Sequence, residues 1–400
     1  AYVSATDPSN LLDGFDHVET VADFKERLKA GRPLRVKLGI DPTSPDLHLG
    51  FMVVLHQLQR FAEAGHRVTL IIGDFTARIG DPSGRNVTRP QLSRDEIEAN
   101  MVAYREQAGK VLDMERIQVR YNSEWLDKLT LTDLVKLLAK TTVAQMLERN
   151  DFHDRYESGV PISLHEFLYP VAQAYDSVAI EADVELGGTD QLFNLLLGRQ
   201  FQREFDQLPQ ICATVPLLVG LDGEKKMSKS FGNYVGVAEP AADQFGKLMK
   251  ISDDLLPVYA RLAAFRPAAE CERLAVGLAA GRANPMDEKK RLAQDIVARY
   301  HGDAAAAAAR DYFERTVQRR EIPTDSLDEI ELGDSKRVSE LLVRAGFAES
   351  KRAAQRLIAG NAVKIDGEVV RDVNALWSSV APAVLSVGAR RFVRVVPRAG

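Results

Sequence analysis

The feature that most constrains the fold is a series of short apolar runs that alternate with helical patterns as far as residue 235. In residues 34–40 every second side chain is apolar, which is typical of a β-strand with one buried face. Further strands are expected at 68–73, 117–121, 178–182 and 211–216, and helices at 48–64, 94–111, 131–139, 142–149, 164–175 and 190–203. Alternating strands and helices form parallel sheets covered on both faces, so the sequence predicts an α/β, Rossmann-like parallel-sheet domain.

The second half of the chain is organised differently, because strand patterns disappear after residue 240 and helical patterns replace them. Helices are expected at 243–250, 254–264, 288–300, 303–318, 337–345 and 350–359, and strands at 362–365 and 391–396. Asp366-Gly367 predicts a tight turn in this last part. The expected domains are a helical lead-in (1–33), the sheet domain (34–235, with a connective insertion at about 100–165), an α-helical domain (236–318), an acidic linker with Pro323 (319–334) and a small α+β module (335–400).

Composition and charge exclude several classes of protein. No run approaches the roughly 18 uncharged apolar residues of a membrane span, and no export signal is recognisable, so we expect a cytoplasmic protein without a membrane partner. The two cysteines, Cys212 and Cys271, are too few for a disulfide framework or a zinc cluster. Residues 331–400 carry 12 Lys and Arg against 7 Asp and Glu, whereas the whole chain has a net charge of −5. A basic module on an acidic body is typical of a nucleic-acid contact.

Two motifs together indicate a polyphosphate site. The first follows the strand at 34–40, where the chain turns through prolines into a helix whose first turn carries His48 and Gly50. A helix N-terminus attracts anions, and glycine lets a bulky group approach the backbone. The second motif, Lys226-Met227-Ser228-Lys229-Ser230, places two ammonium groups on a loop of small residues, where they could close on a triphosphate as charge develops. A helix cap and a solvated surface loop are the alternatives for these two motifs.

Polar residues on one predicted helix indicate a pocket for an amino acid. Tyr169, Gln173 and Asp176 are spaced i, i+4 and i+7 in a mostly apolar stretch, so they share one face of the helix. A carboxylate on that face can accept a hydrogen bond from a phenol. A capped helix end with a solvated Asp176 is the alternative.

Two further turns carry polar groups. Gly187-Gly188-Thr189-Asp190-Gln191 suits a close-packed turn that holds sugar hydroxyls, or a simple helix cap. In the turn after the strand at 68–73, Asp81 could hold an ammonium group, and Arg85 and Arg89 could hold phosphates in fork geometry. A polar surface turn is the alternative for this last segment.

His48-Leu49-Gly50-Phe51 and the lysine motif resemble the two signatures of class I aminoacyl-tRNA synthetases, His-Ile-Gly-His and Lys-Met-Ser-Lys-Ser, with Phe51 in place of the last histidine. All the motifs, taken in order, resemble the tyrosyl-tRNA synthetase family over essentially the whole chain. Lys37-Leu38-Gly39 is similar to a bacterial subgroup, whereas another subgroup has, at the position of Lys37, a tyrosine that contacts the substrate hydroxyl. The resemblance implies a tyrosine–tRNA ligase, which activates L-tyrosine with ATP to tyrosyl-adenylate plus pyrophosphate and then transfers tyrosine to the 3′-terminal ribose of tRNA(Tyr).

The same resemblance implies a role for each motif residue. The tyrosine substrate would be held by Asp176 at its phenol, with Lys37 beside it, and by Tyr169, Gln173, Asp81 and Thr76 around its amino group. ATP and the adenylate would contact Asp41, Thr43, His48, Leu49, Gly50, Phe51, Gly187, Gly188, Asp190, Gln191, Lys226, Met227, Ser228, Lys229 and Ser230. The residues expected to act in catalysis are His48, Lys226, Lys229, Arg85 and Arg89.

The resemblance also implies partners. Mg²⁺ would accompany ATP as part of the substrate, and we expect no tightly bound cofactor or structural metal. A homodimer is expected through the segment near 120–160, where 141–147 could form an apolar face. Residues 336–396 resemble the RNA-binding module first known from a small-subunit ribosomal protein, with a basic helix edge formed by Lys351, Arg352, Gln355 and Arg356. Two other functions remain open: a small-molecule adenylyltransferase, and a catalytically weakened RNA-binding paralogue.

Overall fold

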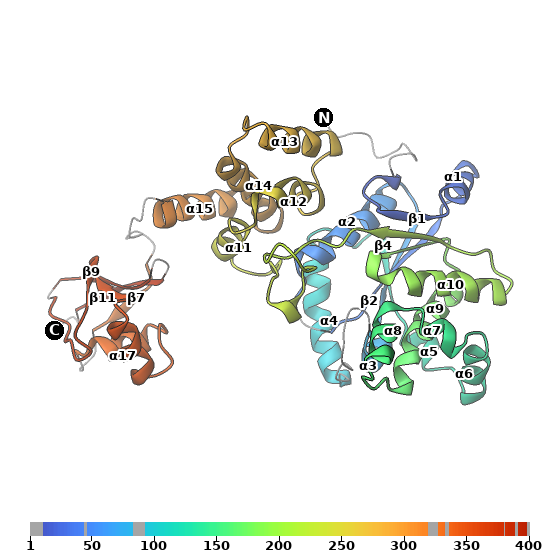
Figure 1. The fold of residues 1–400 in the computed structure, drawn as a ribbon, viewed down its shortest axis with the longest axis horizontal. Helices are drawn as coiled ribbons and strands as arrows, with labels where there is room; N and C mark the ends of the chain where they lie inside the picture. The colour runs from blue at the N-terminus through green and yellow to red at the C-terminus, as the bar shows by residue number, and fades with distance from the viewer. Residues whose placement is uncertain are drawn as a thin grey trace. The chain divides into compact units, whose positions relative to one another are not determined.

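The computed structural model describes residues 11–43, 46–82, 93–318, 327–332, 336–379, 381–388 and 391–397. The chain divides into two compact units, Ala1–Pro240 with Lys247–Tyr300, and Ala241–Gly246 with His301–Gly400 (Figure 1). Each unit has its own β-sheet. The domain boundaries expected from the sequence stay predictions.

The first unit contains a six-stranded sheet with the order β1-β6-β5-β2-β3-β4. Its strands are β1 (His17–Glu19), β2 (Arg35–Ile40), β3 (Arg67–Ile72), β4 (Ile117–Tyr121), β5 (Val184–Gly188) and β6 (Ile211–Val215). The strands β6, β5, β2, β3 and β4 are parallel, which confirms the predicted fold class. The order reverses between β2 and β5, and this reversal is where open α/β sheets form a crevice at their carboxyl edge.

For this unit, one prediction is incomplete and one is wrong. In the described part of the lead-in, the helix α1 (Val21–Lys29) follows β1, which pairs antiparallel with β6 and so makes the sheet mixed. The strand predicted at 178–182 is the end of a helix and a turn, because α9 (Leu168–Ala179) keeps Val178 buried on its inner face and Glu181 then reverses the chain with a φ of 48°. Strand pairing resumes only at β5, whose register on β2 places Glu185 opposite Lys37.

The helices around the sheet follow the expected order. They are α2 (Leu49–Glu63), α3 (Thr76–Ile79), α4 (Arg94–Ala108), α5 (Ser123–Leu126), α6 (Leu131–Leu138), α7 (Val143–Met146), α8 (Asn150–Glu157), α9 and α10 (Leu192–Glu204). Helices α3, α5 and α8 were not predicted. On α2, Met52, Leu55 and Leu58 are fully buried, so the helix that His48 caps is packed firmly against the sheet.

A group of helices completes the first unit: α12 (Leu256–Leu262), α13 (Ala268–Ala279) and α14 (Pro285–His301). Of these, α13 was not predicted. His56 of α2 stacks on Phe265 with 3.9 Å between ring centroids, and Arg266 pairs with Asp295. Helix α11 (Ala241–Leu248) contains residues of both units.

After the α11 residues that belong to it, the second unit contains α15 (Asp303–Phe313) and a π-helical turn (Glu314–Gln318), followed by a five-stranded sheet with the order β7-β11-β10-β8-β9. Its strands are β7 (Glu329–Glu331), β8 (Val363–Ile365), β9 (Glu368–Val369), β10 (Ala383–Val387) and β11 (Arg391–Val396), and its helices are α16 (Val338–Arg344) and α17 (Lys351–Ala359). β9 and β10 were not predicted, and β7 lies in the stretch that was expected to be a linker. Pairing of β7 with β11 accounts for the missed strand β7, since a strand of three residues depends on its partner and leaves little local pattern.

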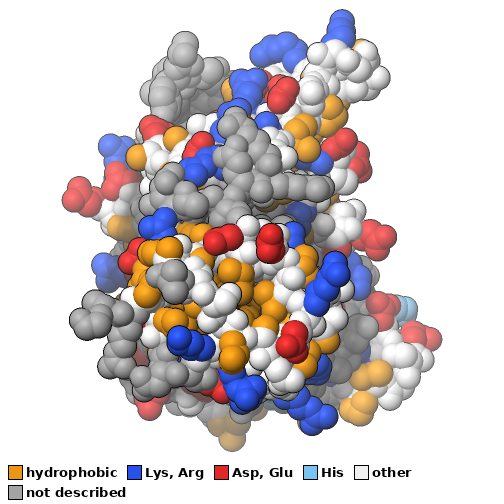
Figure 2. Space-filling model, turned by 90° about the vertical axis from the view of Figure 1, so that its left-hand side faces the viewer, with side chains coloured by type: hydrophobic (Ala, Val, Ile, Leu, Met, Phe, Trp, Pro, Cys, Tyr) orange, Lys and Arg blue, Asp and Glu red, His pale blue; other side chains and the backbone are white. Residues whose placement is uncertain are grey.

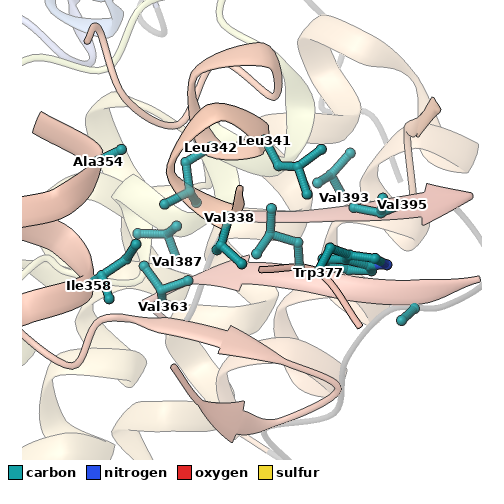
Figure 3. Close-up of a cluster of buried hydrophobic side chains, with 12 residues drawn as sticks. Val338, Leu341, Leu342, Ala354, Ile358, Val363, Trp377, Val387, Val393 and Val395 are labelled. Atoms are coloured by element: carbon teal, nitrogen blue, oxygen red, sulfur yellow. The ribbon is translucent and has the colours of Figure 1, made fainter. Parts of the chain in front are cut away.

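The coloured side chains on the molecular face shown in Figure 2 mix Lys and Arg with Asp and Glu around a central area of hydrophobic and uncharged groups. This face therefore shows no extended patch of one sign among the side chains drawn there. Inside the second unit, α16 and α17 pack on one face of the sheet through Leu341, Leu342 and Ile358, and Trp377 closes the same cluster (Figure 3).

Candidate active site

A cavity of about 680 Å³ lies at the carboxyl ends of β2, β3, β5 and β6, on both sides of the point where the strand order reverses. Most of the residues singled out from the sequence line it together. They are Asp41, Thr43, His48, Gly50, Phe51, Thr76, Asp81, Tyr169, Gln173, Asp176, Gly187, Gly188, Asp190, Gln191, Lys226, Met227, Ser228, Lys229 and Ser230.

Four of the expected residues are placed differently or cannot be placed. Leu49 is fully buried in the core, and Lys37 does not line the cavity, although its neighbour Leu38 does. Arg85 and Arg89 lie outside the described residues.

Asp176 lies at the cavity wall with only 3% of its surface exposed. The indole Nε1–H of Trp125 donates to its Oδ1 over 2.7 Å, and the amide of Asn122 donates to its Oδ2 over 3.4 Å. Burial raises the pKa of this carboxyl to about 7, although the charge of Lys37 and the two donors oppose the shift. The site therefore contains a desolvated acceptor. Trp125 and Asn122 were missed from the sequence, although they follow directly after a predicted strand and could have been found by that position.

Lys37 forms a buried ion pair behind this wall. Its Nζ lies 3.0 Å from Oε1 of Glu185, both side chains are 1% exposed, and it also donates to the backbone carbonyl of Gln173 over 3.4 Å. Oε2 of Glu185 accepts hydrogen bonds from Ser177 and Gln210. Because both charges have hydrogen-bonding partners, the pair can link strands β2 and β5 behind the cavity wall without leaving a buried charge unpaired.

A second carboxylate, Asp41, connects three elements at the edge of the sheet. Its Oδ1 accepts from the hydroxyl of Thr76 over 2.7 Å, and its Oδ2 accepts from the hydroxyl of Tyr169 over 2.9 Å. Gly73 is required beside it, because a Cβ there would lie 2.0 Å from Oδ1 of Asp41. Next to this group, the amide nitrogen of Gln191 donates to Oδ2 of Asp81 over 3.1 Å.

His48 caps α2 and stays neutral near pH 7. Its Nδ1 accepts from the backbone N–H of Gly50 over 3.2 Å, and its ring centroid lies 4.7 Å from that of Phe51. Burial, followed by the charges of Lys229 and Lys226, lowers the pKa of His48 to about 4. Since Nδ1 already accepts from Gly50, the neutral imidazole carries its proton on Nε2 and can donate one hydrogen bond there, while positive charge near the helix start comes from the two lysines.

The loop that carries these lysines is anchored at its base. Met227 is buried, and its N–H donates to the carbonyl of Leu218 over 2.7 Å. Asn233 was missed from the sequence, yet it fastens the loop: its Oδ1 accepts from the N–H of Ser228 over 2.8 Å, and its Nδ2 donates to Asp222 over 2.8 Å and to the Lys226 carbonyl over 3.1 Å.

Both lysines contact groups on the cavity rim. Lys226 Nζ lies 2.6 Å from Oδ2 of Asp190, while Lys229 Nζ donates to the carbonyl of Asp46 and lies 3.8 Å from its Oδ2. Burial lowers the pKa of Lys229, and the charge of Asp46 opposes this shift. The two ammonium groups are thus held beside the cavity on oxygen acceptors that phosphate oxygens can replace.

The four residues proposed to contact RNA lie on α17 of the second unit. Arg352 and Arg356 are exposed, Gln355 is half-buried, and Lys351 lies 3.0 Å from Oε1 of Glu340. The exposed arginines can reach phosphates, whereas Lys351 would have to exchange its carboxylate partner. Their role in RNA binding stays a prediction.

Comparison with known proteins agrees with this geometry. Residues 29–318 match the family model described as "tRNA synthetases class I (W and Y)", and residues 336–376 match the S4 domain. The chain is 49% identical over 373 residues to a tyrosine–tRNA ligase of Thermotoga maritima, with 93% of each chain covered. It is 50% identical over 388 residues to that of Ralstonia nicotianae, covering 96% of this chain and 98% of the relative.

Solved structures show the same fold. A C-terminally truncated mitochondrial tyrosyl-tRNA synthetase of Aspergillus nidulans superposes with a TM-score of 0.62 at 22% identity, covering 78% of this chain and 93% of that one. The tyrosyl-tRNA synthetase of Archaeoglobus fulgidus complexed with L-tyrosine gives a TM-score of 0.63 at 22% identity, covering 77% and 99%. The class I fold predicted from the sequence is confirmed, and so is the resemblance based on its motifs. The chain belongs to the tyrosine–tRNA ligases of the class I aminoacyl-tRNA synthetase family.

Proposed function

We propose that this chain activates L-tyrosine with ATP and transfers it to the 3′-terminal ribose of tRNA(Tyr), with the residues of the 680 Å³ cavity in the roles described below. The observation that carries the proposal is the juxtaposition, around one cavity, of the buried acceptor Asp176 and the two lysines of the anchored loop. Asp176 can accept a hydrogen bond from a phenol, and the two lysines can bind the oxygens of a triphosphate.

Asp176 binds the phenol of the substrate in this proposal. A phenol O–H donates to the carboxylate, which Trp125 already orients through Oδ1. Phenylalanine would leave the buried carboxylate without this donor, and an unmatched buried acceptor costs about 1–3 kcal/mol or more when it is charged. The ammonium group of tyrosine then lies near Asp81, Gln173 and Tyr169.

In the first half-reaction, the tyrosine carboxylate attacks the α-phosphorus of ATP, the bond to pyrophosphate breaks, and tyrosyl-adenylate forms. The nucleophile is already ionised, so catalysis needs alignment and stabilisation of the departing charge rather than a general base. Lys226 and Lys229 supply that stabilisation by moving from Asp190 and Asp46 to phosphate oxygens. Asp190 is then free to accept hydrogen bonds from the ribose. Mg²⁺ enters bound to ATP, and we assign it no protein ligand.

In the second half-reaction, a terminal ribose hydroxyl of tRNA attacks the adenylate carbonyl and releases AMP. The S4 domain supports an RNA contact through Arg352 and Arg356. Because the substrates of this step are tyrosyl-adenylate and tRNA, we place the enzyme in the cytoplasm. Among the described residues, no helix is long and apolar enough to span a membrane.

A homodimer belongs to the same proposal. On α6 and α7, Leu131, Val135 and Val143 are 78%, 60% and 62% exposed, an unusual concentration of large apolar side chains on a surface. A second copy of the chain would cover them. Sedimentation of Val135→Glu against wild type tests this, and a wild-type protein that sediments as a monomer at micromolar concentration would overturn it.

The function is tested by exchange of labelled pyrophosphate into ATP with each amino acid in turn. We expect exchange that depends on tyrosine. Exchange driven by another amino acid would favour a small-molecule adenylyltransferase, and no exchange with any amino acid would favour an RNA-binding paralogue.

A further inference from the structure

Arg149 is a buried arginine beside the cavity that none of the roles above uses. It lies directly before α8, and 4% of its surface is exposed. Its Nε and Nη2 donate to the two oxygens of Asp151 over 3.0 and 3.1 Å, and its Nη1 donates to Oδ1 of Asn194 over 2.9 Å. Nη2 also lies 4.0 Å from Oδ1 of Asp81.

These contacts fix the orientation of Asn194. A guanidinium can only donate hydrogen bonds, so Asn194 has to turn its oxygen toward Arg149. Its amide nitrogen then faces the other way and donates to Oε1 of Gln173 and to Oε1 of Gln191, each over 2.9 Å. One buried charge thereby determines which atom Asn194 presents to the two glutamines.

Each of the two glutamines accepts from Asn194 and donates to a carboxylate on its other side. With its oxygen occupied by Asn194, Gln191 donates through Nε2 to Oδ2 of Asp81 over 3.1 Å. Gln173 donates through Nε2 to Oε1 of Glu185 over 3.2 Å. Glu185 is a carboxylate paired with a lysine and can only accept, so the network of three amides has a charged group of fixed polarity at each end.

The network reaches the cavity through Gln173, Gln191 and Asp81, which line it, whereas Arg149 and Asn194 lie behind them. The proposed function, on which this step rests, places the ammonium group of tyrosine at this wall. An ammonium group needs acceptors, and an amide turned the other way would present N–H groups to it. Oriented as observed, Gln173 keeps a carbonyl oxygen with a second lone pair on this wall.

We propose that Arg149 is a positioning residue for amino-acid recognition: acting through Asn194, it fixes the polarity of Gln173 and Gln191 so that the cavity wall accepts the substrate ammonium group. Neither residue touches the substrate. The competing explanation is that Arg149 only ties α8 to the domain through Asp151, and the two explanations differ in what happens at the ammonium group.

Asn194→Asp separates the two explanations. The new carboxylate keeps its contact with Arg149 and leaves the pair with Asp151 intact, but it can no longer donate to the glutamines. A second variant, Arg149→Met with Asp151→Asn, removes the buried pair together and so leaves no unpaired charge. The matched control is Arg155→Met with Glu166→Gln. This pair is at least as buried, at 1% and 3% side-chain exposure against 4% and 9%, and it involves the same helix but does not line the cavity.

The measurement is the dissociation constant of the full chain for L-tyrosine and for 3-(4-hydroxyphenyl)propionate, which lacks the amino group, together with the melting temperature. We expect both test variants to lose at least about tenfold in their preference for tyrosine over the analogue, equivalent to roughly 1.4 kcal/mol. Affinity for the analogue itself should change little, and the control should keep the wild-type preference.

Variants that keep the wild-type preference, whether or not they melt earlier, would overturn the role of Arg149 and leave the proposed function standing. A wild-type protein that binds neither compound would instead overturn the proposed function, and the role of Arg149 with it.

Discussion

Asp176 gives a test in which function and stability are expected to move in opposite directions. Burial raises the pKa of its carboxyl from 3.8 to about 7 in the folded protein. A carboxyl whose folded pKa is raised contributes most to stability while protonated, below the unfolded pKa, and that contribution is lost as the pH rises through the folded pKa. A shift from 3.8 to about 7 corresponds to about 4 kcal/mol of lost stability above pH 7.

Asp176→Asn removes the ionisation and therefore this loss. The asparagine oxygen can still accept from Trp125, but its amide nitrogen would face the donor of Asn122, at a cost of about 1 kcal/mol. The variant should thus be more stable than wild type by about 3 kcal/mol at pH 8. At pH 5 Asp176 is mostly protonated in the folded wild type. The difference in unfolding free energy between variant and wild type should therefore be about 3 kcal/mol smaller at pH 5 than at pH 8.

The assay is urea unfolding between pH 5 and pH 8, followed by tryptophan fluorescence. The chain has two tryptophans, and Trp377 lies in the core of the second unit, so both proteins would carry Trp377→Phe and report from Trp125 alone. Tyrosine-dependent adenylate formation by Asp176→Asn should fall at every pH. A variant that is no more stable than wild type at pH 8, with no trend between pH 5 and pH 8, would refute the assignment of Asp176 as a desolvated carboxylate.

Three further outcomes are expected. Lys229→Ala should lower the rate of adenylate formation by about 10- to 100-fold while the KM for ATP changes less, because a charge-assisted contact made mainly in the transition state is lost; stopped-flow measurement showing the reverse split would count against this. Asn233→Ala should slow adenylate formation by about tenfold with an unchanged Kd for tyrosine, since it frees the lysine loop but not the amino-acid pocket; weakened tyrosine binding would place the effect elsewhere. Removal of residues 331–400 should spare pyrophosphate exchange and impair tRNA charging, and charging at the wild-type rate would exclude the S4 domain as the RNA contact.

The sequence predicted the parts of the site that depend on local chemistry. Asp176, Asp190 and the two lysines were found because their spacing places them at strand ends, on one helix face or in a short loop. Their convergence on one cavity follows from the rule that parallel strands present their carboxyl ends at one edge. The same rule could have found Trp125, which follows β4 within four residues.

The position of Lys37 could not be predicted from the local sequence pattern. The alternation in residues 34–40 predicted one buried face, which left Lys37 on the other side of the strand. The sheet is covered on both sides, and the register of β2 on β5 places Lys37 opposite Glu185, so a residue expected near the substrate phenol is paired behind the cavity wall. Register between strands that are more than 140 residues apart is a property of the whole fold, and no spacing rule contains it.

The sequence analysis did not identify Arg149 and Asn194 as site residues, for a related reason. A lone arginine before a short helix and an asparagine inside a longer one have no spacing that marks a site, and both act only through other side chains. Their importance comes from burial, because in an interior without water each hydrogen-bond donor needs a protein acceptor. A charged group at the end of a buried network therefore restricts the orientation of the amides hydrogen-bonded to it. Residues that only position other side chains are therefore the hardest to predict from a sequence. Residues that contact a substrate are the easiest, because the chemistry of the substrate restricts which residue types can serve.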